Sequence, residues 1–388
     1  MNTKKTPDIN QNYEGFILNR EAVEIGDIIL ERGYSPHSSL IAKKTNSHYS
    51  HAMIKVDGTI IEATRQGGVY SRVPNRFYVK NINDLKVLRL KEPLSKERER
   101  KLISFSRSLT GSVYSIREAI LAGFDKKPDY ILTRGQFCSR LVAQAYHNAG
   151  ISIVENYNFC SPGDIERSDC FYEVKDAVRR GTISEIKHAM TNGSHVRHQK
   201  SAVKWTRASK SILLKSGVTN IILEGEITSI ETTNDILTAI YQNKDNYEID
   251  EKIARAMHDS GYMDGPYDDE IENPFRYDLK KFIETFNEIP SESRIDALME
   301  EFKKEFSCMN LRLENLDASY QTYFPNKSIK TFKNILIINY LMLKKMLERL
   351  SVLLDYCDNK NIKLDFLSEL KKDHSQLTTS LKQVEALL

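Results

Sequence analysis

The 388-residue chain lacks several features that would assign it to a common functional class. Its five cysteines have no regular spacing and form no CxxC pair, which argues against a disulfide-rich secreted scaffold and against a zinc ribbon. The 56 basic and 53 acidic residues leave a net charge of only +3, so composition predicts no general affinity for polyanions. There is no glycine-rich phosphate-binding loop. We therefore expect no cofactor, no bound metal and no specific nucleic-acid partner.

Long apolar runs are also missing. The first residues, MNTKKTPDINQNYEG, lack the apolar stretch of a signal peptide. The longest apolar run, residues 335–343, is interrupted by Asn339 and is too short to cross a bilayer. We expect a cytoplasmic protein as synthesised, without a transmembrane segment. Secretion by a signal-independent route stays open.

Residues 134–150, RGQFCSRLVAQAYHNAG, predict an amphipathic helix that begins near a cysteine. One stripe of this helix recurs at positions i, i+3, i+4, i+7 and i+11, which are Cys138, Leu141, Val142, Ala145 and Ala149. The thiol then lies in the first turn, where the positive end of the helix dipole lowers a thiol pKa and favours the nucleophilic thiolate. A cysteine on such a stripe is otherwise an ordinary core residue, so catalysis also requires a base.

An earlier hairpin supplies a candidate base. Residues 51–64, HAMIKVDGTIIEAT, are two strand-like runs around Asp57-Gly58, a strong signal for a two-residue turn. With this turn, Met53 lies opposite Glu62. His51, two residues before Met53, is then a diagonal neighbour of Glu62 on the same face. The opposite face predicts a contact with the core, through Ala52, Ile54, Val56, Thr59, Ile61 and Ala63.

A nucleophile, a base and a carboxylate that orients the base make up a catalytic triad. We therefore take Cys138 as the candidate nucleophile, His51 as the base and Glu62 as the orienting carboxylate. Considered separately, each residue has an ordinary alternative role: the histidine would be a structural strand residue, and the glutamate a solvated one. His48, which precedes the strand, is the competing base.

Five motifs follow one another in a distinctive order: GDIILERG, SHAMI-DG-TIIEA, GGVYSRVP, FCSRLVAQAY and CSPGDI. This order resembles the circularly permuted NlpC-type papain-like proteins, the YiiX/YaeF-like bacterial group related to lecithin:retinol acyltransferase, in which the histidine precedes the cysteine. The family's SH, IEA and CSEL motifs match Ser50-His51, Ile61-Glu62-Ala63 and Cys138-Ser139-Arg140-Leu141. The resemblance covers about residues 24–170.

The resemblance implies an α+β fold, a permuted papain-like core of antiparallel sheet plus helices. It also implies cysteine-dependent hydrolysis or acyl transfer at an amide, ester or thioester bond, on lipid-linked or peptide substrates. Arg140 replaces the family's acidic or small residue, and we expect it to alter substrate preference. The oxyanion would be met by the Cys138 backbone N–H and a second donor, with Tyr34 and Tyr114 both open.

Changes of pattern along the chain predict its organisation. The expected regions are a polar leader over 1–23, a catalytic domain over 24–180, a mixed connecting region over 181–275 and a helical-bundle domain over 276–388. Near 262–274 the sequence YMDGPYDDEIENP is expected to be a solvated acidic linker. Helical stripes over about 295–320, 329–357 and 364–387 indicate the bundle.

Two other interpretations of the function stay open. One is a protein-modifying effector, acting as a protease, deamidase or transacylase, whose C-terminal helices bind a protein target. The other is a non-catalytic ligand- or lipid-binding module, against which the presence of all three triad residues argues. A fold of this class does not by itself select the substrate.

Overall fold

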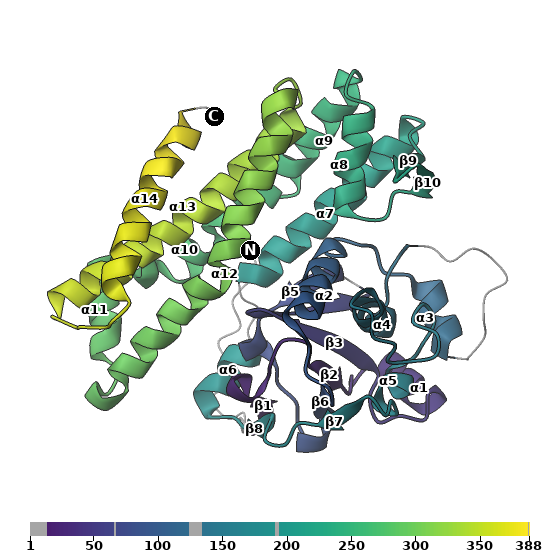
Figure 1. Cartoon of the computed structure of the whole chain (residues 1–388), viewed down its shortest axis with the longest axis horizontal. Helices are drawn as coiled ribbons and strands as arrows, with labels where there is room; N and C mark the ends of the chain where they lie inside the picture. Colours follow the sequence, from purple (N-terminus) through teal and green to yellow (C-terminus); the bar gives the residue numbers. More distant parts are fainter. Residues whose placement is uncertain (1–13, 66, 124–133, 191–193, 387) are drawn as a thin grey trace, which may run out of the picture. The chain divides into compact units, whose positions relative to one another are not determined.

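A computed structural model describes residues 14–65, 67–123, 134–190, 194–386 and 388 (Figure 1). The chain divides into two compact units, Met1–Thr191 and Asn192–Leu388. An antiparallel sheet with helices makes up the first unit, and helices make up most of the second. This confirms the α+β class and the C-terminal helical region that the sequence predicts.

Six strands form the central sheet of the first unit, in the spatial order β5-β4-β3-β2-β6-β7, and all neighbouring pairs are antiparallel. The strands are β2 (Ile28–Glu31), β3 (His51–Val56), β4 (Thr59–Thr64), β5 (Gly68–Arg72), β6 (Leu85–Leu90) and β7 (Phe171–Glu173). The predicted hairpin is β3–β4, with Val56 opposite Thr59. Asp57 in its turn has φ of 41°, the left-handed conformation that such a two-residue turn requires.

Both faces of the sheet are covered. Helices α2 (Lys96–Ser108) and α4 (Cys138–Asn148) pack on the face that carries Ala52 and Ile54, as predicted (Figure 1). On the other face Met53 joins a second apolar cluster. The polar residues of the hairpin therefore stand in a largely apolar surrounding. The remaining helices of the unit are α1 (Pro36–Lys44), α3 (Ile116–Gly123), α5 (Pro162–Glu166) and α6 (Ile183–Met190).

The segment expected as a polar leader contributes to the fold where the structure describes it. Strand β1 (Phe16–Leu18) pairs with β8 (Val178–Arg180), and the Leu18 side chain is buried. Residues 1–13 of the expected leader lie outside the described residues. A three-residue strand is too short to show a period, and its partner lies far along the chain, so local sequence pattern does not reveal it.

The second unit is arranged around α13 (Lys330–Asn359), which contributes to two apolar cores. One core contains Phe302, Leu350 and Leu370, and the other contains Trp205, Ile253 and Phe332. The other elements are α7 (Ser194–Lys215), β9 (Asn220–Leu223), β10 (Glu226–Ser229), α8 (Thr233–Gln242), α9 (Tyr247–Asp259), α10 (Asp268–Glu272), α11 (Leu279–Asn287), α12 (Arg294–Tyr323) and α14 (Leu367–Glu385).

Three long helices, α12, α13 and α14, occupy the part of the second unit where the sequence predicts helical stripes. The predicted stripe of the last helix extends to position 387, which lies outside the described residues. None of the helices in the described part of the chain combines the length and the apolarity needed to span a bilayer.

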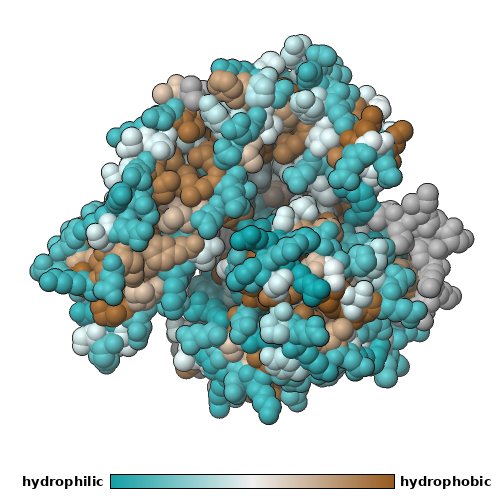
Figure 2. All heavy atoms as spheres, in the orientation of Figure 1, coloured by the Kyte–Doolittle hydropathy of each residue, from teal (hydrophilic) through white to brown (hydrophobic). Residues whose placement is uncertain are grey.

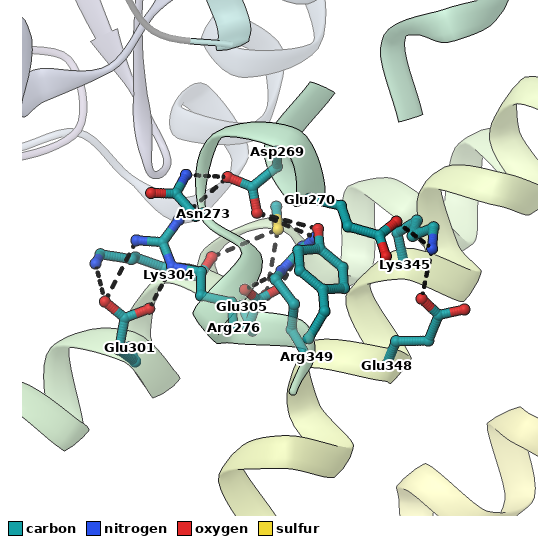
Figure 3. A network of polar contacts seen from close by, with 12 residues as sticks. Asp269, Glu270, Asn273, Arg276, Glu301, Lys304, Glu305, Lys345, Glu348 and Arg349 are labelled. Carbon is teal, nitrogen blue, oxygen red and sulfur yellow. Dashed lines mark hydrogen bonds and ion pairs between the residues drawn. The ribbon is translucent and has the colours of Figure 1, made fainter. Parts of the chain in front are cut away.

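Residues 262–274, expected to be a solvated linker, are folded into the second unit. They form a 3-10 helix (Tyr262–Tyr267) and α10, and a further 3-10 helix (Pro274–Tyr277) follows. The acidic side chains have basic partners (Figure 3): Asp269 lies 3.1 Å from Arg276, and Glu270 lies 2.7 Å from Lys345. The region expected to connect two domains, 181–275, is divided between the two units at Thr191.

A small apolar surface lies on the second unit. Figure 2 shows apolar atoms gathered where Figure 1 places the β9–β10 hairpin. Ile222 and Ile227 are opposite each other in this hairpin and are 57% and 77% exposed. These two side chains lie outside both apolar cores.

The start of α13 generates a prediction about stability. Its N-cap residue, Ile329, offers no capping side chain. Instead the buried Asp250 carboxylate accepts hydrogen bonds from the backbone N–H groups of Lys330 at 2.7 Å and Thr331 at 3.0 Å. We predict that Asp250→Ala lowers the free energy of unfolding of the second unit by about 1–2 kcal/mol, the usual effect of losing a helix cap. Urea titration monitored by fluorescence of Trp205, the only tryptophan, measures it.

Asp250→Asn is the matched variant for this experiment, because an amide oxygen still caps a helix. It should lose less stability than Asp250→Ala. Equal stability of the Ala variant and the unmodified protein would contradict the capping role.

Candidate active site

Cys138 is the first residue of α4, and the whole residue is only 6% exposed. The helix start is tied to a neighbouring loop, because the Ser139 hydroxyl donates a hydrogen bond to the Cys160 carbonyl oxygen at 2.7 Å. The thiol therefore lies at the positive end of the helix dipole, in a fixed place, as the helical stripe in the sequence indicates.

His51 and Glu62 meet on the hairpin as the sequence predicts. His51 begins β3, and its Nε2 lies 2.7 Å from Oε2 of the buried Glu62 on β4. The His51 side chain is 20% exposed, and its ring also interacts with the Cys138 thiol. Because Nε2 faces the carboxylate, Nδ1 is the ring nitrogen left for the thiol. The structure thus brings the three predicted residues together in the order Glu62, His51, Cys138.

The surroundings of the thiol and the ring favour charge on both. Burial alone raises the pKa of Cys138, but the hydrogen bond and charge of His51, with the backbone N–H groups of Ala52 and Ser139, lower the pKa below its ordinary value. Burial alone lowers the pKa of His51, but hydrogen bonds to Cys138 and Glu62 and their charges raise it to about 10. Each group therefore favours the charged form of the other, the thiolate of Cys138 and the imidazolium of His51.

Two residues that the sequence reasoning missed hold Glu62. Burial alone raises the pKa of this carboxyl, but the charge of Arg72, whose Nη1 lies 3.8 Å from Oε1, and the His51 hydrogen bond lower it. Tyr70 on β5 lies opposite Glu62 and also contributes to the lowered pKa of this carboxyl. The alternation in GVYSR places Tyr70 and Arg72 on one face, but only the pairing of β5 with β4 shows that this is the face of Glu62.

The competing base and one candidate oxyanion donor belong to another cluster. His48 Nε2 lies 3.0 Å from Oδ1 of the buried Asp84, and the Tyr34 hydroxyl donates to Oδ2 of the same carboxylate at 2.7 Å. Both side chains are thus engaged with Asp84, and His51, not His48, faces the thiol.

Tyr114 lies beside the nucleophile. It forms a parallel bridge with Gln136, two residues before Cys138. Burial chiefly raises the pKa of Tyr114, and the negative charge on Cys138 raises it further. The phenol is therefore protonated at neutral pH and available as a hydrogen-bond donor close to the thiol.

The sequence leads us to expect that Arg140 alters substrate preference, but the structure places its side chain in the interior. Its side chain is 1% exposed, and its Nη1 lies 2.6 Å from the buried Glu118 carboxylate. It also donates to the carbonyl oxygens of Gly135 at 2.8 Å and Asn158 at 2.7 Å. The residue holds the loop that precedes Cys138 against the core, and its partner on another helix is invisible to a local motif.

The first unit combines an antiparallel sheet, a helix that begins at a cysteine and a histidine that precedes this cysteine in the chain. Residues 22–189 match the model of the family described as "Permuted papain-like amidase enzyme, YaeF/YiiX, C92 family". This confirms the resemblance predicted from the motifs for that part of the chain. Because the family is one of amidases, the match supports a function of the cysteine-hydrolase type.

A solved structure that matches is that of metalloprotein yiiX from Escherichia coli O157:H7. The identity is 21%, the TM-score is 0.30, and the match covers 39% of this chain and 96% of that chain. No curated protein matches. Within the described ranges of the present chain, no group of three or more His, Cys, Asp or Glu residues is placed to hold a metal ion.

The electrostatics predict that Cys138 reacts selectively. At pH 6.5 an ordinary thiol is roughly 1% ionised, and burial raises the pKa values of Cys160, Cys308 and Cys357 further. Iodoacetamide should therefore label Cys138 first, at a rate that changes little between pH 6.5 and 8.5, whereas an ordinary thiol gains about 50-fold. Peptide mass spectrometry identifies the labelled site.

His51→Ala provides the control, because it removes the ring whose charge stabilises the thiolate. In this variant, labelling of Cys138 should become slow at pH 6.5 and should rise with pH. Faster labelling of Cys160 or Cys170 in the unmodified protein would show that the nucleophile is assigned wrongly.

Proposed function

We propose that the first unit is a thiol amidase in which Cys138 is the nucleophile, His51 the general acid and base, and Glu62 the group that orients the imidazole. The observation that carries the proposal is the convergence of the three side chains: His51 Nε2 lies 2.7 Å from Glu62 Oε2, and His51 and Cys138 each favour the charged form of the other. The amidase family match supports an amide as the bond that is cleaved. Esters and thioesters present the same acyl carbon to the thiolate.

In the proposed acylation step, the Cys138 thiolate attacks the carbonyl carbon, a C–S bond forms and the carbonyl π electrons move onto oxygen. Collapse of this tetrahedral oxyanion breaks the C–N bond, and the imidazolium of His51 gives its proton to the leaving amine. In deacylation, neutral His51 takes a proton from water while the water oxygen attacks the thioester carbon. The C–S bond then breaks, which releases the carboxylic product and restores the ion pair.

Acyl transfer differs from this scheme only in the acceptor. An alcohol or amine in place of water, deprotonated by the same His51, would yield an ester or amide product instead of an acid. The triad serves both reactions equally, so the accessibility of the acceptor decides between them.

Two groups support stabilisation of the oxyanion. The Cys138 N–H lies in the first turn of α4, where backbone N–H groups have no partner within the helix. The Tyr114 hydroxyl is the second donor we propose, because Tyr34 is bonded to Asp84. Donors aimed at the developing charge stabilise the transition state more than the ground state.

The full chain, assayed on a 4-nitroanilide of a short fatty acid, tests the triad. We expect His51→Ala to reduce turnover by about 10²- to 10⁴-fold, the contribution of a positioned acid–base group. Glu62→Gln should reduce it less, because an orienting group contributes less than the base it orients. Intact-mass spectrometry should detect the acyl group on Cys138 during turnover.

His48→Ala is the matched control, since this histidine is bonded to Asp84 and should be dispensable. Circular dichroism establishes that each variant is folded. An inactive His48→Ala together with an active His51→Ala, or an acyl adduct on another cysteine, would contradict the proposal.

Tyr114→Phe removes the proposed second donor without removing the ring. We expect kcat to fall about 10²-fold with little change in KM, because the hydrogen bond is made only to the oxyanion. Labelling of Cys138 at pH 6.5 should persist. Tyr34→Phe serves as the paired control and should leave kcat unchanged, and an equal loss in both variants would argue against a specific role for Tyr114.

The alternative of a protein-modifying effector has one supporting observation, the exposed pair Ile222 and Ile227 on the β9–β10 hairpin. Exposed apolar side chains of this kind are common at partner-binding surfaces. The apolar faces of α12 and α13, which the sequence offers for a partner, are instead largely used within the core of the second unit. We retain selection of the substrate by this unit as a proposal.

A further inference from the structure

The first unit contains a pocket of about 680 Å³, and none of the three triad residues lines it. It lies where β2 begins and β6 ends, and Lys55 of β3 is part of its wall. Lys55 is four residues beyond His51 on the same strand, which at about 3.3 Å per residue puts roughly 13 Å between their Cα atoms. The pocket is thus separate from the candidate active site.

Lys55 carries a charge that the described residues do not neutralise directly. The residue is only 8% exposed, and its ammonium group has no hydrogen-bond or ion-pair partner in the described part of the chain. Burial lowers its pKa to about 8, against the longer-range attraction of Asp57 and Asp27. The ammonium itself reaches solvent, so the accessible end of this mostly buried side chain opens into the pocket, where an anion can pair with it.

The nearby carboxylates are already engaged by arginines. Asp27 accepts two hydrogen bonds from Arg89, at 2.8 and 2.9 Å, and Glu24 lies 2.6 Å from the same guanidinium. Asp57 lies 2.6 Å from Arg107. Among the mostly buried residues of the pocket wall, Lys55 is therefore the positive group that no carboxylate pairs with directly.

The other residues of the pocket wall limit the charge and the polarity of a ligand that can bind there. Two further charged side chains line the pocket, the exposed Lys91 and the half-buried Glu99, and Glu99 is paired with Lys96. Leu94 and Tyr172 provide accessible apolar surface in the same pocket, and the buried Tyr146 lies behind them. The surrounding carboxylates repel a dianion more strongly than a monoanion.

We propose that this pocket binds a small monocarboxylate with an apolar body, whose carboxylate group pairs with the ammonium of Lys55. A charge-assisted hydrogen bond would pair the carboxylate with the ammonium, and the apolar body would lie along the leucine and tyrosine side chains. Binding at this pocket does not involve the triad, so it is tested independently of the proposed amidase function.

Isothermal titration of the full chain with hexanoate tests the proposal, with hexan-1-ol as the uncharged analogue and inorganic phosphate as the dianion. We expect hexanoate to bind with a Kd on the order of 1 mM and Lys55→Met to weaken binding at least about tenfold. Hexan-1-ol should bind more weakly and should not respond to the substitution. Lys91→Met is the matched control at the same pocket and should leave hexanoate affinity within about twofold.

Lys55→Arg keeps the charge and should retain binding, which separates loss of the ammonium from damage to the fold. Hexanoate affinity should also fall as pH rises through about 8, where Lys55 loses its proton while the carboxylate stays ionised. Equal affinity of Lys55→Met and the unmodified protein, affinity independent of pH between 7 and 9, or tighter binding of phosphate than of hexanoate would each overturn the proposal.

Discussion

The hydrogen bond between His51 and Glu62 depends on the register of one hairpin, and the rest of the candidate site depends on that bond. The two-residue turn at Asp57-Gly58 sets this register. A slip of one residue would turn Glu62 toward the face that carries Ile61, and the imidazole would lose its carboxylate. With the register in place, one ring nitrogen is fixed by the carboxylate, and the other is left to face the thiol of α4.

Local sequence patterns were sufficient to predict those parts of the candidate site that lie within one hairpin or one helix. A turn dipeptide and strand alternation predict that His51 and Glu62 are neighbours, and helical spacing predicts a cysteine in a first turn. Arg72 and Tyr70 could not be assigned in this way, because their role depends on how β5 pairs with β4. The prediction of a solvated linker at residues 262–274 was wrong for a related reason. Their acidic composition is typical of such a linker, but their basic partners Arg349 and Lys345 lie on a helix that is distant in sequence.

In both units, buried carboxylates have basic side chains as partners. Glu62 has Arg72 and His51 in the first unit, and the Glu305 carboxylate in the second has Arg349 at 2.7 Å (Figure 3). Removal of one member from such a pair leaves the other desolvated without compensation, which costs far more than the pair itself contributes. The same holds next to the thiol, where His51 lowers the pKa of Cys138 and Cys138 raises the pKa of His51.

The start of α4 combines several requirements of the proposed chemistry in one rigid element. It presents the thiol, it directs the positive end of a helix dipole at the thiolate, and it offers backbone N–H groups at the place where an oxyanion would form. Ser139 fixes this turn to the Cys160 carbonyl, and Arg140 fixes the preceding Gly135. Because these anchors lie in the core and do not depend on substrate, the donors and the nucleophile are positioned before binding, and little reorganisation is needed when charge develops on the acyl oxygen.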